Sequence, residues 1–366
     1  MARLSGIHAL PLVAALVITV AVPAPGHSDE GRQQPIASVT DGLAKHIATA
    51  LADRQAREQV VTITATRPAD LRAIRWDART THLIETANQA VVRAKGLPVN
   101  TDSLLRIRLA QRDMSTALRN GETPLVAATP TDDTAARLVA YDPSGKVSLL
   151  DPAQAPQRPV LLVEVDVTKA MSIGLRLVQD TLGKQRLAQA PPATSAATNA
   201  TAASGYWATK VGAVRLSSDE EPWFKGGAEI YAIVGGFGLD GLAKVNIIQM
   251  PYLDNDGTTY YPNQLLVHFN GYKYNLADIV MMEDDGDTNY QALATAIANA
   301  LLAIVDGGVY APLVNAILNA IPASWWTDDP DYVDSWYTLA TTSAGRVTGA
   351  RANGWMDVSP YWVAPL

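Results

Sequence analysis

The sequence predicts an α+β fold, in which a mixed α/β N-terminal domain precedes a C-terminal antiparallel β-sandwich with an inserted helical hairpin. Residues 30–187 alternate segments of helical periodicity with short strand-like segments. Residues 206–366 contain mostly short apolar segments separated by turn residues, which is typical of an antiparallel β protein. Residues 188–205 between them are mostly small and carry no charge, so we expect a flexible linker there.

The beginning of the chain has the pattern of a secretory signal peptide. Arg3 is followed by an apolar run at 9–22 and then by the sequence PAPG at 23–26. The run is shorter than the ~20 residues that a membrane-spanning helix needs. We therefore expect residues 1–26 to be removed, leaving a secreted or periplasmic protein with no transmembrane segment in the mature chain.

We expect three helices and one strand at the start of the N-terminal domain, followed by four more strands. A helix is expected around Leu43, Ile47 and Leu51, which recur every four residues, with Ser38 or Thr40 as its cap. The other expected elements are a strand at 60–66, helices at 81–95 and 102–119, and strands at 125–128, 137–141, 147–150 and 160–167.

The C-terminal domain is expected to be rich in strands. They are expected at 228–234, 245–250, 265–269, 278–282, 332–341 and 355–362. An Ala/Leu/Ile/Asn-rich stretch at 290–321, broken by Asp306-Gly307-Gly308, predicts the helical hairpin. The letters Gly-x-Gly-x-x-Gly at 236–241 match a dinucleotide-binding fingerprint, but a strand follows them where the fingerprint requires a helix. We predict a hairpin turn instead.

Acidic residues are concentrated in the C-terminal domain. Residues 206–366 contain 18 acidic and 7 basic residues, whereas residues 27–205 contain 18 and 21. The acids cluster in loops next to predicted strands, and calcium prefers 6–8 oxygen ligands supplied by flexible loops of this kind. If the loop before the 228–234 strand meets the loop after the 278–282 strand, they form a calcium site. The candidate ligands are Asp219, Glu221, Glu229, Glu283, Asp285 and Asp287. The alternative is a set of ordinary acidic turns, because Asp, Asn and Gly favour turns in any case.

Part of this domain resembles the calcium-dependent C-two β-sandwich. Glu229-Ile230-Tyr231 stands where that family has an Asp-Pro-Tyr strand, and Met282-Glu283-Asp284-Asp285 stands where it has Val-Asp-x-Asp. The resemblance covers only about 75 residues, uses Glu for Asp and continues into the helical hairpin. It implies calcium ligation by Glu221, Glu229, Glu283, Asp285 and Asp287, together with contact to phospholipid.

Four segments carry a second and longer resemblance. They are KGGAEIY at 225–231, PYLDND at 251–256, YYPNQ at 260–264 and DYVDSWYT at 331–338. Through them the whole chain resembles a family of secreted bacterial proteins catalogued as domain of unknown function 3103. That resemblance implies no particular activity.

Several function classes are disfavoured by what the sequence lacks. Its net charge of −7 argues against a nucleic-acid partner, and the absence of cysteine excludes disulfides and thiol catalysis. No Gly-x-Ser-x-Gly elbow or His-Glu-x-x-His helix is present. We therefore expect a calcium-binding, non-enzymatic binding or adhesion module whose ligand is a carbohydrate, a protein or a lipid surface. Two alternatives stay open, a metal- or carboxylate-dependent hydrolase using the acidic cleft and a calcium-dependent membrane-binding protein.

Overall fold

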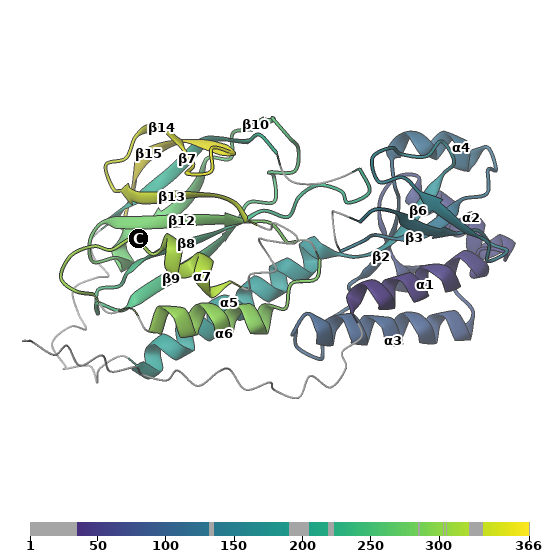
Figure 1. Ribbon diagram of the computed structural model, residues 1–366, viewed down its shortest axis with the longest axis horizontal. Helices are drawn as coiled ribbons and strands as arrows, with labels where there is room; N and C mark the ends of the chain where they lie inside the picture. The colour runs from purple at the N-terminus through teal and green to yellow at the C-terminus, as the bar shows by residue number, and fades with distance from the viewer. Residues whose placement is uncertain are drawn as a thin grey trace, which may run out of the picture. The chain divides into compact units, whose positions relative to one another are not determined.

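The computed structural model describes residues 35–131, 135–189, 205–218, 223–284, 286–302, 304, 306–321 and 332–365 (Figure 1). The predicted α+β fold is confirmed, because the described residues form seven α-helices and fifteen strands arranged in three sheets. No helix in these ranges is both long enough and apolar enough to span a membrane. The predicted signal peptide and most of the predicted linker lie outside the described residues.

The N-terminal part is built on one mixed sheet with the strand order β1-β2-β6-β3-β4-β5. Strands β3 and β6 are parallel and the other neighbours are antiparallel. Helix α1 packs against this sheet and against α3. The elements are α1 (Ile36–Ala50), α2 (Arg54–Thr64), β1 (Ala69–Asp70), η1 (Leu71–Ala73), α3 (Ala78–Ala94), β2 (Leu105–Leu109), η2 (Arg112–Met114), α4 (Ser115–Arg119), β3 (Leu125–Ala128), β4 (Leu138–Tyr141), β5 (Val147–Leu150), β6 (Val160–Val165) and α5 (Val167–Gln189).

The C-terminal part contains two antiparallel sheets. One has the order β10-β7-β15-β14, with β11 also paired to β7, and the other has the order β13-β12-β8-β9. The elements are β7 (Tyr206–Leu216), β8 (Tyr231–Phe237), β9 (Ala243–Gln249), β10 (Thr259–Tyr260), β11 (Gln264–His268), η3 (Phe269–Gly271), β12 (Leu276–Met282), α6 (Tyr290–Leu302), α7 (Val314–Ala320), β13 (Tyr332–Ala340), β14 (Gly345–Thr348) and β15 (Gly354–Val363).

The central strands of the second sheet are buried on both faces. Strand β8 contains no charged residue and β12 contains one, Asp278, as expected for strands buried on two sides. On one face their residues pack with those of β7 and β15 in a core between the two sheets. On the other face they pack in a second core that also contains residues of α5, α6, α7 and the N-terminal sheet. That second core therefore includes residues from both sides of the predicted linker.

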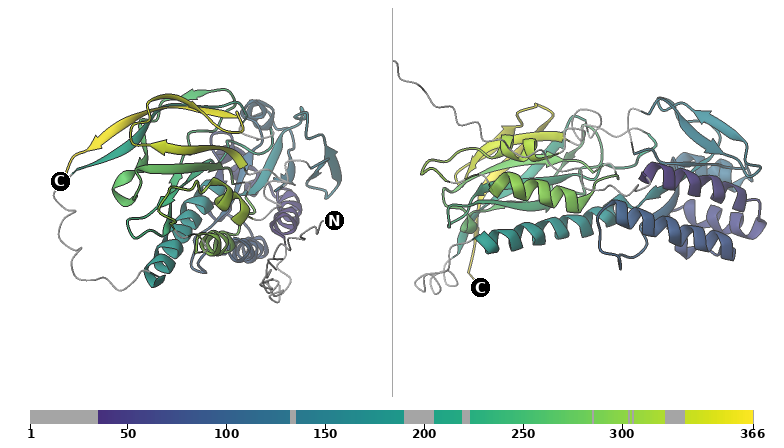
Figure 2. Two further views of the ribbon diagram at one scale, coloured as in Figure 1. Left: turned by 60° about the vertical axis from the view of Figure 1, so that its left-hand side comes forward. Right: turned by 60° about the horizontal axis from the view of Figure 1, so that its bottom comes forward.

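Helices α5 and α6 run side by side at close range (Figure 2). Gly174 of α5 faces Tyr290 of α6, and a Cβ atom added to Gly174 would lie 2.2 Å from the tyrosine ring. Glycine at this position allows the backbone of α5 to approach the ring. Buried residues of α5 recur at helical spacing, among them Met171, Leu175 and Val178, and they supply the helix face that packs into the core.

Three predictions about secondary structure were wrong. Residues 60–66 belong mostly to helix α2 and do not form a strand, because Asp53 caps the helix by accepting a hydrogen bond from the Ala56 backbone N–H at 2.9 Å. Residues 102–119 form β2, η2 and α4 instead of one helix. Helix α1 begins after Pro35 with no side-chain cap, and the Thr40 hydroxyl donates to the Ile36 carbonyl inside the helix.

Most of the remaining elements were predicted correctly, within a few residues at their ends. The turn at 236–241 connects β8 to β9, and Gly241 adopts a positive φ of 77° there. Helices α6 and α7 lie within the predicted hairpin at 290–321. Helix α5 and strands β1, β7, β10 and β14 were not predicted.

Candidate functional site

The outer polar face of the N-terminal sheet carries a compact charged network. The alternation of β2 buries its leucine and isoleucine side chains and turns Arg106 and Arg108 to the other face. Arg106 pairs directly with Glu164 of β6 in the strand register. The Glu164 carboxylate accepts from Arg106 Nε at 2.6 Å, from Arg108 Nε at 2.8 Å and from the Thr129 hydroxyl at 3.0 Å. Arg106 Nη1 also donates to Asp166 at 3.2 Å. These contacts fix both guanidinium groups in place.

Glu229 approaches this network from the loop that precedes β8. Its Oε1 accepts a hydrogen bond of 2.8 Å from the hydroxyl of Thr168, in the first turn of α5. Burial raises the pKa of Glu229 to about 7, although the Thr168 hydrogen bond and the charge of Arg106 oppose the rise. A carboxyl group with a pKa in this range changes its charge near neutral pH, which is typical of functional sites.

The two acidic loops singled out in the sequence do meet. The Asp284 backbone N–H donates to the Glu229 carbonyl at 3.2 Å, so the residues that follow β12 lie beside the residues that precede β8. This contact continues the pairing of β12 with β8, in which Met282 lies opposite Tyr231.

Asp284 itself belongs to a buried network that connects α3 to α6. Lys95 follows α3, and its Nζ lies 3.7 Å from Asp284 Oδ1, with both side chains fully buried. The Tyr290 hydroxyl donates to Asp284 Oδ2, and the Gly286 backbone N–H donates to Oδ1 at 3.0 Å. Asn289 joins the helix ends, because its Nδ2 donates to the last carbonyl of α3 and its Oδ1 accepts from the first turn of α6.

Two hollows adjoin these networks. The first, which we call the Glu229 cleft, has a volume of about 40 Å³. Its lining is Ile36, Thr40, Arg106, Thr129, Pro130, Thr131, Glu164, Val165, Val167, Lys225, Gly226, Gly227, Glu229, Asp284 and Gly286.

The second hollow, which we call the arginine groove, is larger, with a volume of about 870 Å³. Its lining is Thr64, Ala65, Thr66, Arg67, Pro68, Arg106, Arg108, Leu109, Ala110, Arg112, Ser115, Gly226, Gly227, Asp254 and Asn255. Arg106, Gly226 and Gly227 border both hollows, so the cleft and the groove are neighbours. A Cβ on Gly227 would lie only 2.8 Å from the Asp254 Cβ, which explains the need for glycine between them.

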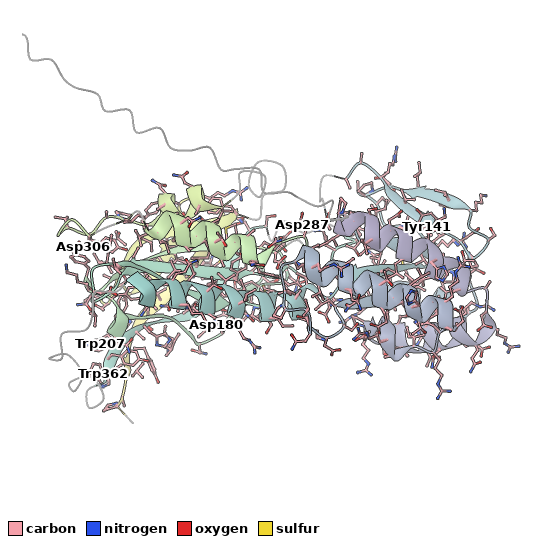
Figure 3. The ribbon with its side chains drawn as sticks, turned by 90° about the horizontal axis from the view of Figure 1, so that it is seen from below. Tyr141, Asp180, Trp207, Asp287, Asp306 and Trp362 are labelled. Atoms are coloured by element: carbon pink, nitrogen blue, oxygen red, sulfur yellow. The ribbon has the colours of Figure 1, made fainter. Side chains whose placement is uncertain are left out.

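The structure describes three of the six predicted calcium ligands, and these three differ in how exposed they are. Glu229 lines the cleft, Glu283 is buried, and Asp287 is exposed. Asp287 and Asp306 lie at opposite ends of α6 (Figure 3). Asp219, Glu221 and Asp285 lie outside the described residues. Within the described ranges, no group of three or more His, Asp or Glu side chains is arranged to hold a metal ion.

The family of the chain is established by its sequence profile. The profile described as "Protein of unknown function (DUF3103)" matches residues 36–366. The chain belongs to this family. No curated protein and no solved structure matches it. The resemblance to the C-two β-sandwich is not confirmed by these comparisons.

Reasoning from the sequence missed the cationic half of this candidate site. Arg106 and Arg108 were placed on a predicted helix, and Lys95 was placed at the end of one with no role in a site. The Leu-Arg-Ile-Arg-Leu alternation of residues 105–109 is a strand signal that places both arginines on one face. No sequence signal shows that Lys95 would meet Asp284.

Proposed function

We propose that this protein is a binding protein for an anionic ligand, which it holds in the arginine groove. The observation that carries the proposal is the charge of the groove. Four arginines line it against one acidic residue, Asp254, although the chain as a whole has a net charge of −7. Glu164 offsets part of this positive charge, and the exposed Arg67 and Arg112 leave an excess that favours an anionic partner.

The four arginines differ in how they are already engaged. Arg106 and Arg108 are held by Glu164, and Arg108 Nη2 also donates to the Phe224 carbonyl at 2.6 Å. Arg67 and Arg112 are exposed, and neither forms an ion pair with any residue that the structure describes. Their planar guanidinium groups match the geometry of carboxylate, sulfate and phosphate groups. In the groove, the ligand would thus contact two arginines that Glu164 holds in place and two exposed arginines whose side chains can reorient.

Reversing the charge of the two exposed groove arginines tests this proposal. We expect Arg67→Glu/Arg112→Glu to weaken binding of a polyanion about 100-fold, because each lost charge-assisted contact is worth about tenfold in affinity. Polygalacturonate, heparin and polyphosphate, titrated calorimetrically at low and high salt, distinguish carboxylate, sulfate and phosphate as the recognised group.

The matched control is Arg79→Glu/Arg93→Glu, which makes the same change in charge at two exposed positions of α3 outside the groove. It is expected to reduce affinity only through the long-range field, by about twofold. Equal losses in the two double variants would show that total charge decides binding and that the groove does not. Failure of the unaltered protein to bind any of the three polyanions would remove the proposal.

Calcium remains our second proposal, at the acidic loops that meet beside Asp284. The contact between Asp284 and Glu229 supports it, because it brings the loop before β8 and the loop after β12 together. We expect calcium to raise the midpoint of thermal unfolding, since a cation that binds only the folded state stabilises it by mass action. The measurement compares EDTA, calcium and magnesium. An unchanged midpoint in calcium would rule out calcium binding at these loops.

A further inference from the structure

We propose that Glu229 is a general base that activates a water molecule for hydrolysis of an acyl bond in the anionic ligand. The inference rests on the proposed binding function, because the arginine groove is what would hold the ligand. It adds an activity to that function and assigns the role of catalytic residue to Glu229.

The position of Glu229 is the first argument. Thr168 holds one carboxylate oxygen, Oε1, and no residue that the structure describes donates a hydrogen bond to Oε2. The cleft of about 40 Å³ beside it has room for one or two water molecules. The cleft is also lined by Arg106 and by the polar side chains of Thr129 and Thr131, so that a water there has several polar neighbours.

The other described carboxylates of the cleft are already committed. Glu164 accepts from two arginines and from Thr129. Asp284 accepts from Tyr290 and Gly286 and lies beside Lys95. Glycoside hydrolysis needs two available carboxyl groups on either side of the bond. A single available carboxylate next to cations fits acyl hydrolysis better, because a base is needed on one side and positive charge on the other.

The reaction balances without a further reactant. Water gives a proton to Glu229 while its oxygen bonds to the acyl carbon, and the carbonyl electrons move to the oxygen, which becomes an anion. Arg106 stabilises this oxyanion. The carbonyl then re-forms, the bond to the leaving oxygen breaks, and Glu229 returns the proton to that oxygen. The products are a carboxylic acid and an alcohol.

The position of the cleft beside the groove determines the class of substrate. Arg106, Gly226 and Gly227 belong to both hollows, so an anion bound by Arg67 and Arg112 would extend towards Glu229. The substrate class is therefore an ester that carries a negative charge on its acyl part.

The test uses the whole protein with two ester probes that differ in charge. They are the 4-nitrophenyl monoester of succinic acid, which carries a carboxylate, and neutral 4-nitrophenyl acetate. We expect faster hydrolysis of the anionic ester than of the neutral ester. Glu229→Gln is expected to lower kcat at least 100-fold. Arg79→Glu/Arg93→Glu serves as the control variant and is expected to retain the full rate.

The outcomes separate this inference from the proposed binding function. If the protein binds polygalacturonate but hydrolyses neither ester faster than buffer, the catalytic role is wrong and the binding function stands. Catalysis that survives Glu229→Gln also overturns the role of Glu229. Hydrolysis that depends on Glu229 but favours neither ester, in a protein that binds no polyanion, would overturn the proposed function and the substrate class with it. Folding of the variant is checked by its circular dichroism and its unfolding midpoint.

Discussion

Lys95→Met is expected to lower the free energy of unfolding by about 3–5 kcal/mol, because it removes one partner of a fully buried ion pair. The Lys95 and Asp284 side chains are both 0% exposed, and their charged atoms lie 3.7 Å apart. Lys95 Nζ also lies 5.1 Å from the centre of the Tyr290 ring. After the substitution the Asp284 carboxylate would keep the Tyr290 and Gly286 hydrogen bonds but lose its only described cation. Denaturant unfolding monitored by tryptophan fluorescence measures the change.

A double-mutant cycle separates the ion pair from the loss of packing. Asp284→Asn alone is expected to be about as damaging as Lys95→Met, because it leaves the ammonium group buried without its counter-ion. The double variant Lys95→Met/Asp284→Asn is expected to be more stable than the sum of the single effects implies, by at least 1 kcal/mol. Strict additivity, or a loss below 1 kcal/mol in Lys95→Met, would contradict the assignment of Lys95 and Asp284 as an ion pair that stabilises the fold.

The sequence predicts secondary structure best where local and tertiary preferences agree. Helix α3 and strands β3 to β6 were predicted because their periodicity and their end signals point the same way. Residues 60–66, most of which belong to α2, were predicted as a strand because their side chains alternate in polarity. In the folded chain, the Asp53 cap and the burial of Val60 and Thr64 at helical spacing outweigh that preference.

For a similar reason, only part of the candidate site could be predicted from the sequence. Glu229 could be named because it stands in an acidic loop beside a strand, and such loops are visible in one stretch of sequence. The contact between Arg106 and Glu164 joins residues 58 positions apart, and it exists only through the pairing of β2 with β6. The contact of Lys95 with Asp284 depends on where α3 ends relative to α6, which periodicity alone does not specify.

Glu229→Gln is expected to stabilise the protein at pH 8 by about 2 kcal/mol and to change its stability little at pH 4. The folded pKa of about 7 lies above the usual value of 4.5 because burial disfavours the ionised form. Between those values the folded protein keeps a proton that the unfolded chain has lost. Stability therefore falls as the pH rises from about 4.5 to about 7, and the loss persists at higher pH.

Unfolding free energies of the unaltered and substituted proteins, measured from pH 4 to pH 8, check this sign. Glu122→Gln, at an exposed position, is the control and is expected to give a flat difference. A Glu229→Gln difference that is independent of pH, or largest at pH 4, would mean that burial does not disfavour the ionised carboxylate. If Glu229→Gln is the more stable protein at pH 8, the negative charge of Glu229 destabilises the folded protein at the pH at which this residue is ionised. Packing then gives no reason for a carboxylate at this position, whereas its proposed role as a base beside the arginine groove does.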